Sequence, residues 1–158
     1  MREVFALSAL TQGSMVLLSY IIYFPEENMW AGLNDRVVFA IWCVTSSLSA
    51  VAFLSFSGML VYSADDGSVV YFLTIFPYAA FLASSACYMP LAAAGMKVWT
   101  MFLLFVAAAS ACALVYCSLV LFGATWVTYL MGVLAFHCSV IDLIFWGFTW
   151  STGRVDAA

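Results

Sequence analysis

Five long apolar stretches alternate along this chain with short polar interruptions. Each stretch is long enough to cross a bilayer as an α-helix, which takes about 20 apolar residues. A single helix over the last two stretches would be about twice that length, so Gly123 is expected to separate them. The pattern therefore predicts an all-α, polytopic membrane protein. We expect one domain covering residues 1–158, a compact bundle of five transmembrane helices over about residues 4–24, 37–62, 69–92, 98–122 and 125–150.

The composition also indicates that the chain lies in a lipid bilayer. Its 158 residues are 67% hydrophobic and 8% charged, with a mean hydropathy of +1.12. Soluble domains carry about 25% charged residues, so this chain could not cover its own surface in water. Its 4 Lys and Arg residues exclude a nucleic-acid interface, which needs a basic patch.

Catalytic and metal sites have little support in the residue pattern. The chain has one histidine, and no nucleophile elbow, phosphate loop or metalloprotease motif occurs in it. Its 5 cysteines all fall inside apolar stretches, without the spacing of a zinc site, and are interpreted as small hydrophobic residues. We therefore predict no catalytic residues and no metal ligands, and favour a protein that is not an enzyme.

Basic residues suggest an orientation. Arg2 precedes the first stretch, whereas Arg36, Lys97 and Arg154 fall on the other side of the predicted bundle. Cytoplasmic loops carry the excess of Lys and Arg, so this asymmetry predicts a cytoplasmic C-terminus.

The last apolar stretch contains a carboxylate, Asp142, where lipid is the expected solvent. One row of this helix, at alternating steps of three and four residues, is mostly small or polar: Thr125, Thr128, Gly132, Ala135, Ser139, Asp142, Trp146 and Thr149. The row on the other side is mostly apolar: Val127, Leu130, Leu134, His137, Ile141, Ile144 and Phe148. We predict that the first row packs against protein and that the second faces lipid.

Three interpretations of Asp142 remain open. It could hydrogen-bond as a protonated acid to Ser or Thr on another helix, line a polar ligand pocket, or relay protons or ions. A membrane-embedded carboxylate costs about 2.5–3.5 kcal/mol to insert, so such residues are usually partnered or functional. No Lys or Arg lies within the apolar stretches near it, which favours the neutral acid.

His137 lies on the same helix, about 140° around it from Asp142 in 3.6-residue geometry. The two are therefore not expected to form a pair on one face. His137 is predicted to contact another subunit, hydrogen-bond a carbonyl, or ligate the metal of a tetrapyrrole.

Three short motifs resemble the TspO/MBR family (translocator protein, tryptophan-rich sensory protein). Residues 38–42, VFAIW, resemble the family's V-F-P-x-x-W at the start of span two. Residues 88–91, YMPL, are similar to its W-S/T-P-L/V at the end of span three. Residues 141–146, IDLIFW, are similar to its L-N-x-x-I-W in span five, with Asp142 where Asn is usual.

This resemblance implies a membrane pocket near the first loop that binds a lipophilic ligand, either a tetrapyrrole or a sterol-like molecule. By position, six residues would line it: Trp30, Trp42, Ser85, Tyr88, Asp142 and Trp146. Flat aromatic rings suit a flat ligand, and a few polar groups would orient it. We expect a homodimer formed through faces rich in small residues.

Two other functions are compatible with the sequence. The chain could be a non-catalytic accessory subunit of a larger photosynthetic or respiratory membrane complex, with His137 touching a pigment or a partner chain. It could also be a small proton-coupled carrier that uses Asp142.

Overall fold

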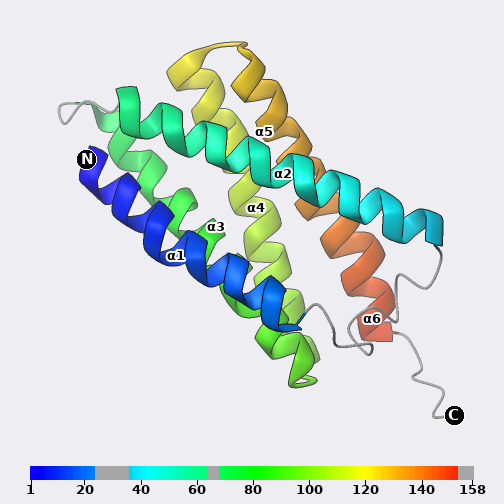
Figure 1. Ribbon diagram of the computed structural model, residues 1–158. Helices are drawn as coiled ribbons and strands as arrows, with labels where there is room; N and C mark the ends of the chain where they lie inside the picture. The colour runs from blue at the N-terminus through cyan, green and yellow to red at the C-terminus, as the bar shows by residue number, and fades with distance from the viewer. Residues whose placement is uncertain (24–35, 64–67, 153–158) are drawn as a thin grey trace, which may run out of the picture.

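The computed structural model describes residues 1–23, 36–63 and 68–152. Their backbone forms five long helical spans (Figure 1). Four are continuous α-helices: α1 (Arg2–Tyr23), α2 (Arg36–Ser63), α3 (Val69–Ala93) and α4 (Lys97–Phe122). The fifth combines α5 (Trp126–Phe136), the π-helix η2 (His137–Phe148) and α6 (Thr149–Thr152). The predicted all-α bundle of five helices is confirmed.

The helices form a closed ring. α1 packs against α2 and α3, α2 packs against α5, and α4 packs against α3 and the fifth span. The order around the ring is therefore α1, α2, fifth span, α4, α3. Spans that follow one another in the sequence run in opposite directions (Figure 1). This arrangement brings α2 and η2 together although about 100 residues separate them.

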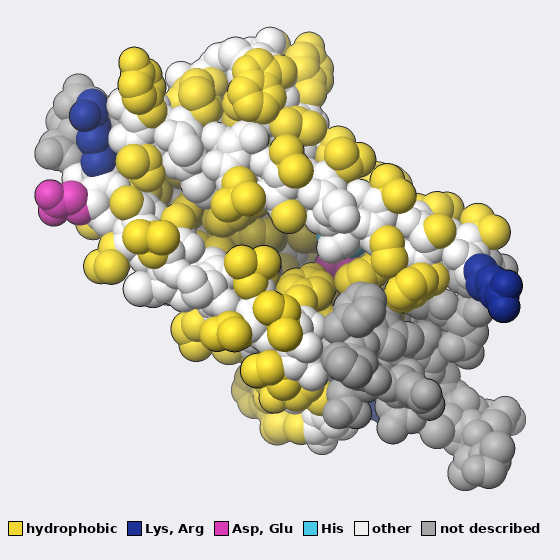
Figure 2. All heavy atoms as spheres, in the orientation of Figure 1, with side chains coloured by type: hydrophobic (Ala, Val, Ile, Leu, Met, Phe, Trp, Pro, Cys, Tyr) yellow, Lys and Arg dark blue, Asp and Glu magenta, His cyan; other side chains and the backbone are white. Residues whose placement is uncertain are grey.

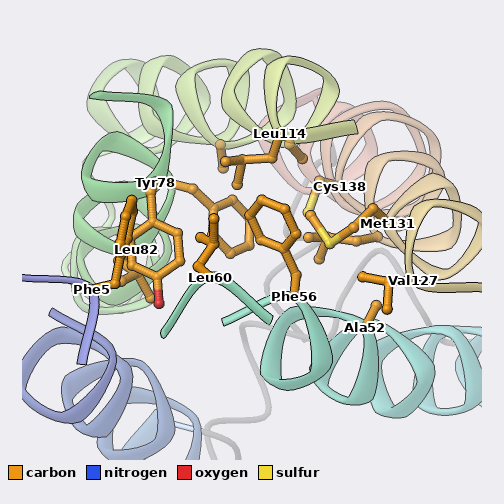
Figure 3. Close-up of a cluster of buried hydrophobic side chains, with 14 of the residues drawn as sticks. Phe5, Ala52, Phe56, Leu60, Tyr78, Leu82, Leu114, Val127, Met131 and Cys138 are labelled. Carbon is orange, nitrogen blue, oxygen red and sulfur yellow. The ribbon is translucent and has the colours of Figure 1, made fainter. Parts of the chain in front are cut away.

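Two buried clusters fill the ring. The larger lies toward the start of α1, where the rings of Phe5 and Tyr78 meet edge to face at 5.4 Å and Phe56 is fully buried (Figure 3). The smaller lies toward the other end and includes Trp42, Tyr88 and Trp146. Lipid is as apolar as these side chains, so close packing rather than the hydrophobic effect stabilises the clusters.

The outer surface is apolar, as a bilayer requires. All five spans have stretches with a mean hydropathy between 1.6 and 2.3 and contain many exposed large hydrophobic residues. In Figure 2 hydrophobic side chains are spread over the whole visible face, whereas the Lys and Arg side chains lie at its ends. We conclude that the chain is a multi-pass membrane protein.

The predicted assignment of faces on the fifth span is wrong in part. Val127, Leu134 and Ile141 belong to the row expected to face lipid, yet they are 0%, 3% and 7% exposed. The fifth span lies between α2 and α4 and contacts both, so a second side of it is also covered. Apolarity alone cannot separate a lipid-facing leucine from a packed one, because both surroundings are apolar.

Two of the basic residues used to predict the orientation, Arg36 and Lys97, lie at the same end of the bundle. α2 begins at Arg36 and α4 begins at Lys97, at the end of the bundle opposite Arg2. The Lys97 Nζ atom donates a hydrogen bond to the Ser151 carbonyl oxygen at 3.1 Å, as basic residues near helix C-termini commonly do. Arg154 lies outside the described residues. The cytoplasmic position of this end stays a prediction.

Candidate functional site

Asp142 is the centre of a buried polar group between α2 and η2. Its side chain is 5% exposed, and its Oδ1 atom accepts a hydrogen bond of 2.9 Å from the indole Nε1–H of Trp42. Trp42 is itself 4% exposed. An indole N–H that is buried needs an acceptor, and a buried carboxyl needs donors, so each residue satisfies the other.

His137 belongs to the same group, which corrects the predicted geometry of the fifth span. Its Nε2 atom lies 3.4 Å from Asp142 Oδ2, and its side chain is buried at 3% exposure rather than facing lipid. The cause is the π-helical winding of His137–Phe148. Hydrogen bonds from i to i+5 put more residues into each turn, so residues five apart lie closer to one face than the separation of about 140° that they have in an α-helix.

Thr45 links the histidine to α2. Its Oγ1 atom lies 2.9 Å from His137 Nδ1 and 2.8 Å from the carbonyl oxygen of Ile41. Thr45 follows Trp42 by three residues, so both side chains leave α2 on the same side. The polar group therefore runs as a chain from Thr45 through His137 and Asp142 to Trp42.

Aromatic rings from four spans surround this polar chain. Trp42 contacts Tyr20 of α1 with ring centroids 6.2 Å apart, and Tyr88 of α3 meets Trp146 edge to face at 5.7 Å. Trp146 stacks on Trp150 at 5.7 Å. We call Tyr20, Trp42, Tyr88, Trp146 and Trp150 the aromatic wall. It supplies flat apolar surfaces next to a small number of polar atoms.

A hydrogen bond between two phenols closes the wall between α1 and α3. The Tyr20 and Tyr88 hydroxyl oxygens are 2.6 Å apart, and Tyr88 is 3% exposed.

We expect Tyr20→Phe to lower the free energy of unfolding by about 1 kcal/mol, because the buried Tyr88 hydroxyl then loses its partner. Unfolding in mixed detergent micelles measures this. Tyr116→Phe, at a side chain that is 70% exposed, is the control and should change little.

The residues singled out in the sequence have different positions relative to this site. Four of them, Trp42, Tyr88, Asp142 and Trp146, lie together in it. Ser85 is buried on α3, one helical turn before Tyr88. Trp30 lies outside the described residues.

Sequence reasoning missed three members of the site: Tyr20, Thr45 and Trp150. Tyr20 lies near the end of the first span and Trp150 near the end of the fifth, where aromatic residues are commonly interpreted as interfacial, and this obscured their place in the site. Thr45 carried a usable signal, since it lies one turn after Trp42 on the same face. Its partner could not be identified while His137 was expected to face away from Asp142.

The site is nearly closed, and its visible part faces the seam between α1 and α2. Figure 2 shows a small area with the colours of acidic and histidine side chains between these two helices. Along the same seam, toward the start of α1, lies an open groove of about 940 Å³. Small side chains line much of that groove, including Ala6, Ala9 and Gly58. The α1–α2 seam is therefore incompletely filled.

No cluster of metal-ligating side chains occurs in the part of the chain that the structure describes. No three His, Cys, Asp or Glu side chains there are grouped closely enough to hold an ion. Hydrogen bonding and ring stacking are the interactions that this site offers to a ligand.

Comparison with known proteins identified no relative of this chain. No protein-family model, curated protein or solved structure matches this chain.

Proposed function

We propose that this protein binds a flat lipophilic molecule, a tetrapyrrole or a sterol-like compound, at the aromatic wall around Asp142. One observation carries the proposal. Trp42, Asp142 and Trp146, together with Tyr88, come from three separate motifs and meet in one buried cluster. These are four of the six residues that the resemblance to the TspO/MBR family implies for a ligand pocket.

The chemistry of the cluster fits such a ligand. Binding sites for small molecules are mostly apolar and aromatic, with a few placed polar groups that orient the ligand. Here indole and phenol rings supply the flat surfaces, and Asp142 and His137 supply the polar end. The rings now pack on one another, so a ligand would replace ring–ring contacts of 5.7–6.2 Å with contacts to itself.

The α1–α2 seam is the proposed route of entry. Tyr20 of α1 contacts Trp42, so an outward movement of this end of α1 would uncover the wall from the bilayer side. The groove of about 940 Å³ farther along the seam supports this route, because it lies between the same two helices. A molecule dissolved in lipid would then reach the site without crossing water.

A binding titration with matched tryptophan variants tests the proposal. Protoporphyrin IX and a fluorescent sterol are the probes, and the protein is held in lipid nanodiscs. We expect Trp146→Ala to raise the Kd of the bound probe at least about tenfold, because buried aromatic anchors commonly contribute 2 kcal/mol or more. Trp126→Ala, at a side chain that is 63% exposed on the same span, is the control and should leave the Kd unchanged.

Two results would contradict the proposal. One is the absence of saturable binding of either probe to the unmodified protein. The other is an equal Kd for Trp146→Ala and Trp126→Ala with both variants folded.

A further inference from the structure

We propose that Thr45, His137, Asp142 and Trp42 form a proton-binding site, in which His137 and Asp142 together hold one shared proton and are neutral as a pair. This inference does not depend on the lipophilic ligand. It rests on the direction of each hydrogen bond in the chain and on the absence of a compensating cation among the described neighbours of the site.

The described neighbours of Asp142 provide hydrogen-bond donors and no Lys or Arg cation. The titratable groups facing it are the phenols of Tyr20 and Tyr88, which bond to each other, and the thiol of Cys138. All three are neutral when protonated. From α4 the apolar residues Met101 and Leu104 pack beside the site. Within the described part of the chain, His137 is therefore the group that can balance a charge on Asp142.

An ionised Asp142 beside a neutral His137 would be a single uncompensated charge inside the membrane. Such charges are strongly disfavoured, because little water is available to solvate them and the effective penalty is several kcal/mol for each ion. The neutral alternatives both contain one more proton: a protonated Asp142 with neutral His137, or an Asp142 carboxylate with a charged imidazolium. Because both side chains are buried, either neutral state of the pair is favoured over an ionised Asp142 beside a neutral His137.

Thr45 fixes where the proton can lie. Its hydroxyl has one hydrogen, which it donates to the Ile41 carbonyl oxygen one turn back at 2.8 Å, a common pattern for threonine in helices. The hydroxyl oxygen therefore accepts from His137 Nδ1–H across 2.9 Å. This assignment leaves Nε2, the nitrogen that faces Asp142 Oδ2, as the place where a proton is accepted or held.

The Nε2 position is suited to a proton that moves. Nε2 is buried and has no conventional hydrogen bond among the described residues. Its distance to Asp142 Oδ2 is 3.4 Å, slightly longer than the usual upper limit of about 3.2 Å for a hydrogen bond to oxygen. Without a proton two lone pairs would face each other across this gap. With one, a small rotation of the His137 or Asp142 side chain completes the bond.

The single histidine makes the protonation state directly measurable. Labelling the protein with ¹⁵N-histidine gives one imidazole signal set, because the chain has one histidine. Solid-state NMR in lipid bilayers at pH 7 then reports which ring nitrogens carry hydrogen. Infrared spectroscopy, compared with Asp142→Asn, reports whether Asp142 gives the band of a protonated carboxyl.

Two combined results support the proposal: hydrogen on Nδ1 alone together with the carboxyl band, or hydrogen on both nitrogens without that band. Every other combination overturns it. Hydrogen on one nitrogen without the band would mean a buried anion, and hydrogen on both with the band would mean two protons. Hydrogen on Nε2 alone would remove the role of Thr45.

A threonine variant tests the positioning role separately. Thr45→Val removes the acceptor for Nδ1–H while retaining the shape of the side chain, and we expect the Nδ1–H signal to shift or the hydrogen to move to Nε2. Thr149→Val, at an exposed threonine on the same span as His137, should leave the spectrum unchanged. An unchanged spectrum in folded Thr45→Val would overturn the assignment.

Discussion

Replacing Asp142 by alanine is expected to lower the free energy of unfolding by about 3–5 kcal/mol, the range seen when one member of a buried pair is removed. The indole N–H of Trp42 would lose its acceptor, and Nε2 of His137 would lose the oxygen that it faces at 3.4 Å. Unfolding of the variant in mixed detergent micelles, followed by circular dichroism, gives this value.

A double-mutant cycle separates the pair from general loss of packing. Trp42→Phe retains a ring at that position but removes the donor, so the cost of Asp142→Ala should fall by about 1–2 kcal/mol in the Trp42→Phe background. If the losses of unfolding free energy caused by Asp142→Ala and Trp42→Phe were additive, the hydrogen bond between the two side chains would not be the origin of the loss. An Asp142→Ala protein as stable as the unmodified one would also contradict the prediction.

Replacing Gly147 by valine is expected to cost about 3 kcal/mol of unfolding free energy, the upper part of the range for overpacking. A Cβ atom at this position would lie 2.7 Å from Leu104 Cδ1 and 3.0 Å from the carbonyl oxygen of Asp142. The leucine side chain can rotate away, but the carbonyl belongs to the η2 backbone. The added side chain should therefore distort the η2 backbone beside Asp142, and it should also crowd Leu104 and Met101 of α4.

Gly132→Val is the matched control on the same span. A Cβ atom at Gly132 would meet nothing within 4 Å, so a change of less than about 0.5 kcal/mol is expected. Equal destabilisation by the two variants would mean that valine in this span, rather than the contact between η2 and α4, causes the loss. In the same samples, the Gly147 variant should also show altered tryptophan fluorescence, because Trp146 is its chain neighbour.

The positions of the spans could be predicted closely from sequence. The second span was expected over residues 37–62 and is Arg36–Ser63, and the third was expected over 69–92 and is Val69–Ala93. Length and apolarity decide where a chain enters and leaves a bilayer, and both are properties of sequence alone. The polar breaks between stretches are equally visible.

Which side of a span faces protein was harder to predict. Val127 and Leu134 were assigned to lipid because they are apolar, but they lie in the packed core. The bilayer and the protein interior present similar chemistry to such side chains, so hydropathy has no preference between them. Asp142 was placed correctly toward protein because its polarity distinguishes the two environments.

The pairing of His137 with Asp142 depended on a backbone feature that no residue pattern indicated. Periodicity assumes 3.6 residues per turn, and a change to i→i+5 bonding invalidates every face assignment beyond it. Thr45 was overlooked for the same reason, because it is informative only once its partner is located. The short motifs identified Trp42, Tyr88 and Trp146 without needing the helix geometry.

The π-helical segment lies between the two ends of the fifth span, so a change in its winding would move one end relative to the other. A helix wound more widely is also shorter for the same number of residues, so each peptide that returned to α-helical bonding would lengthen and rotate the remainder. Trp146 and Trp150 would turn past Tyr88, while Ser151 would move relative to Lys97. A change of winding near His137 would thus rotate and shift the C-terminal end of the fifth span, where Ser151 accepts the hydrogen bond of Lys97.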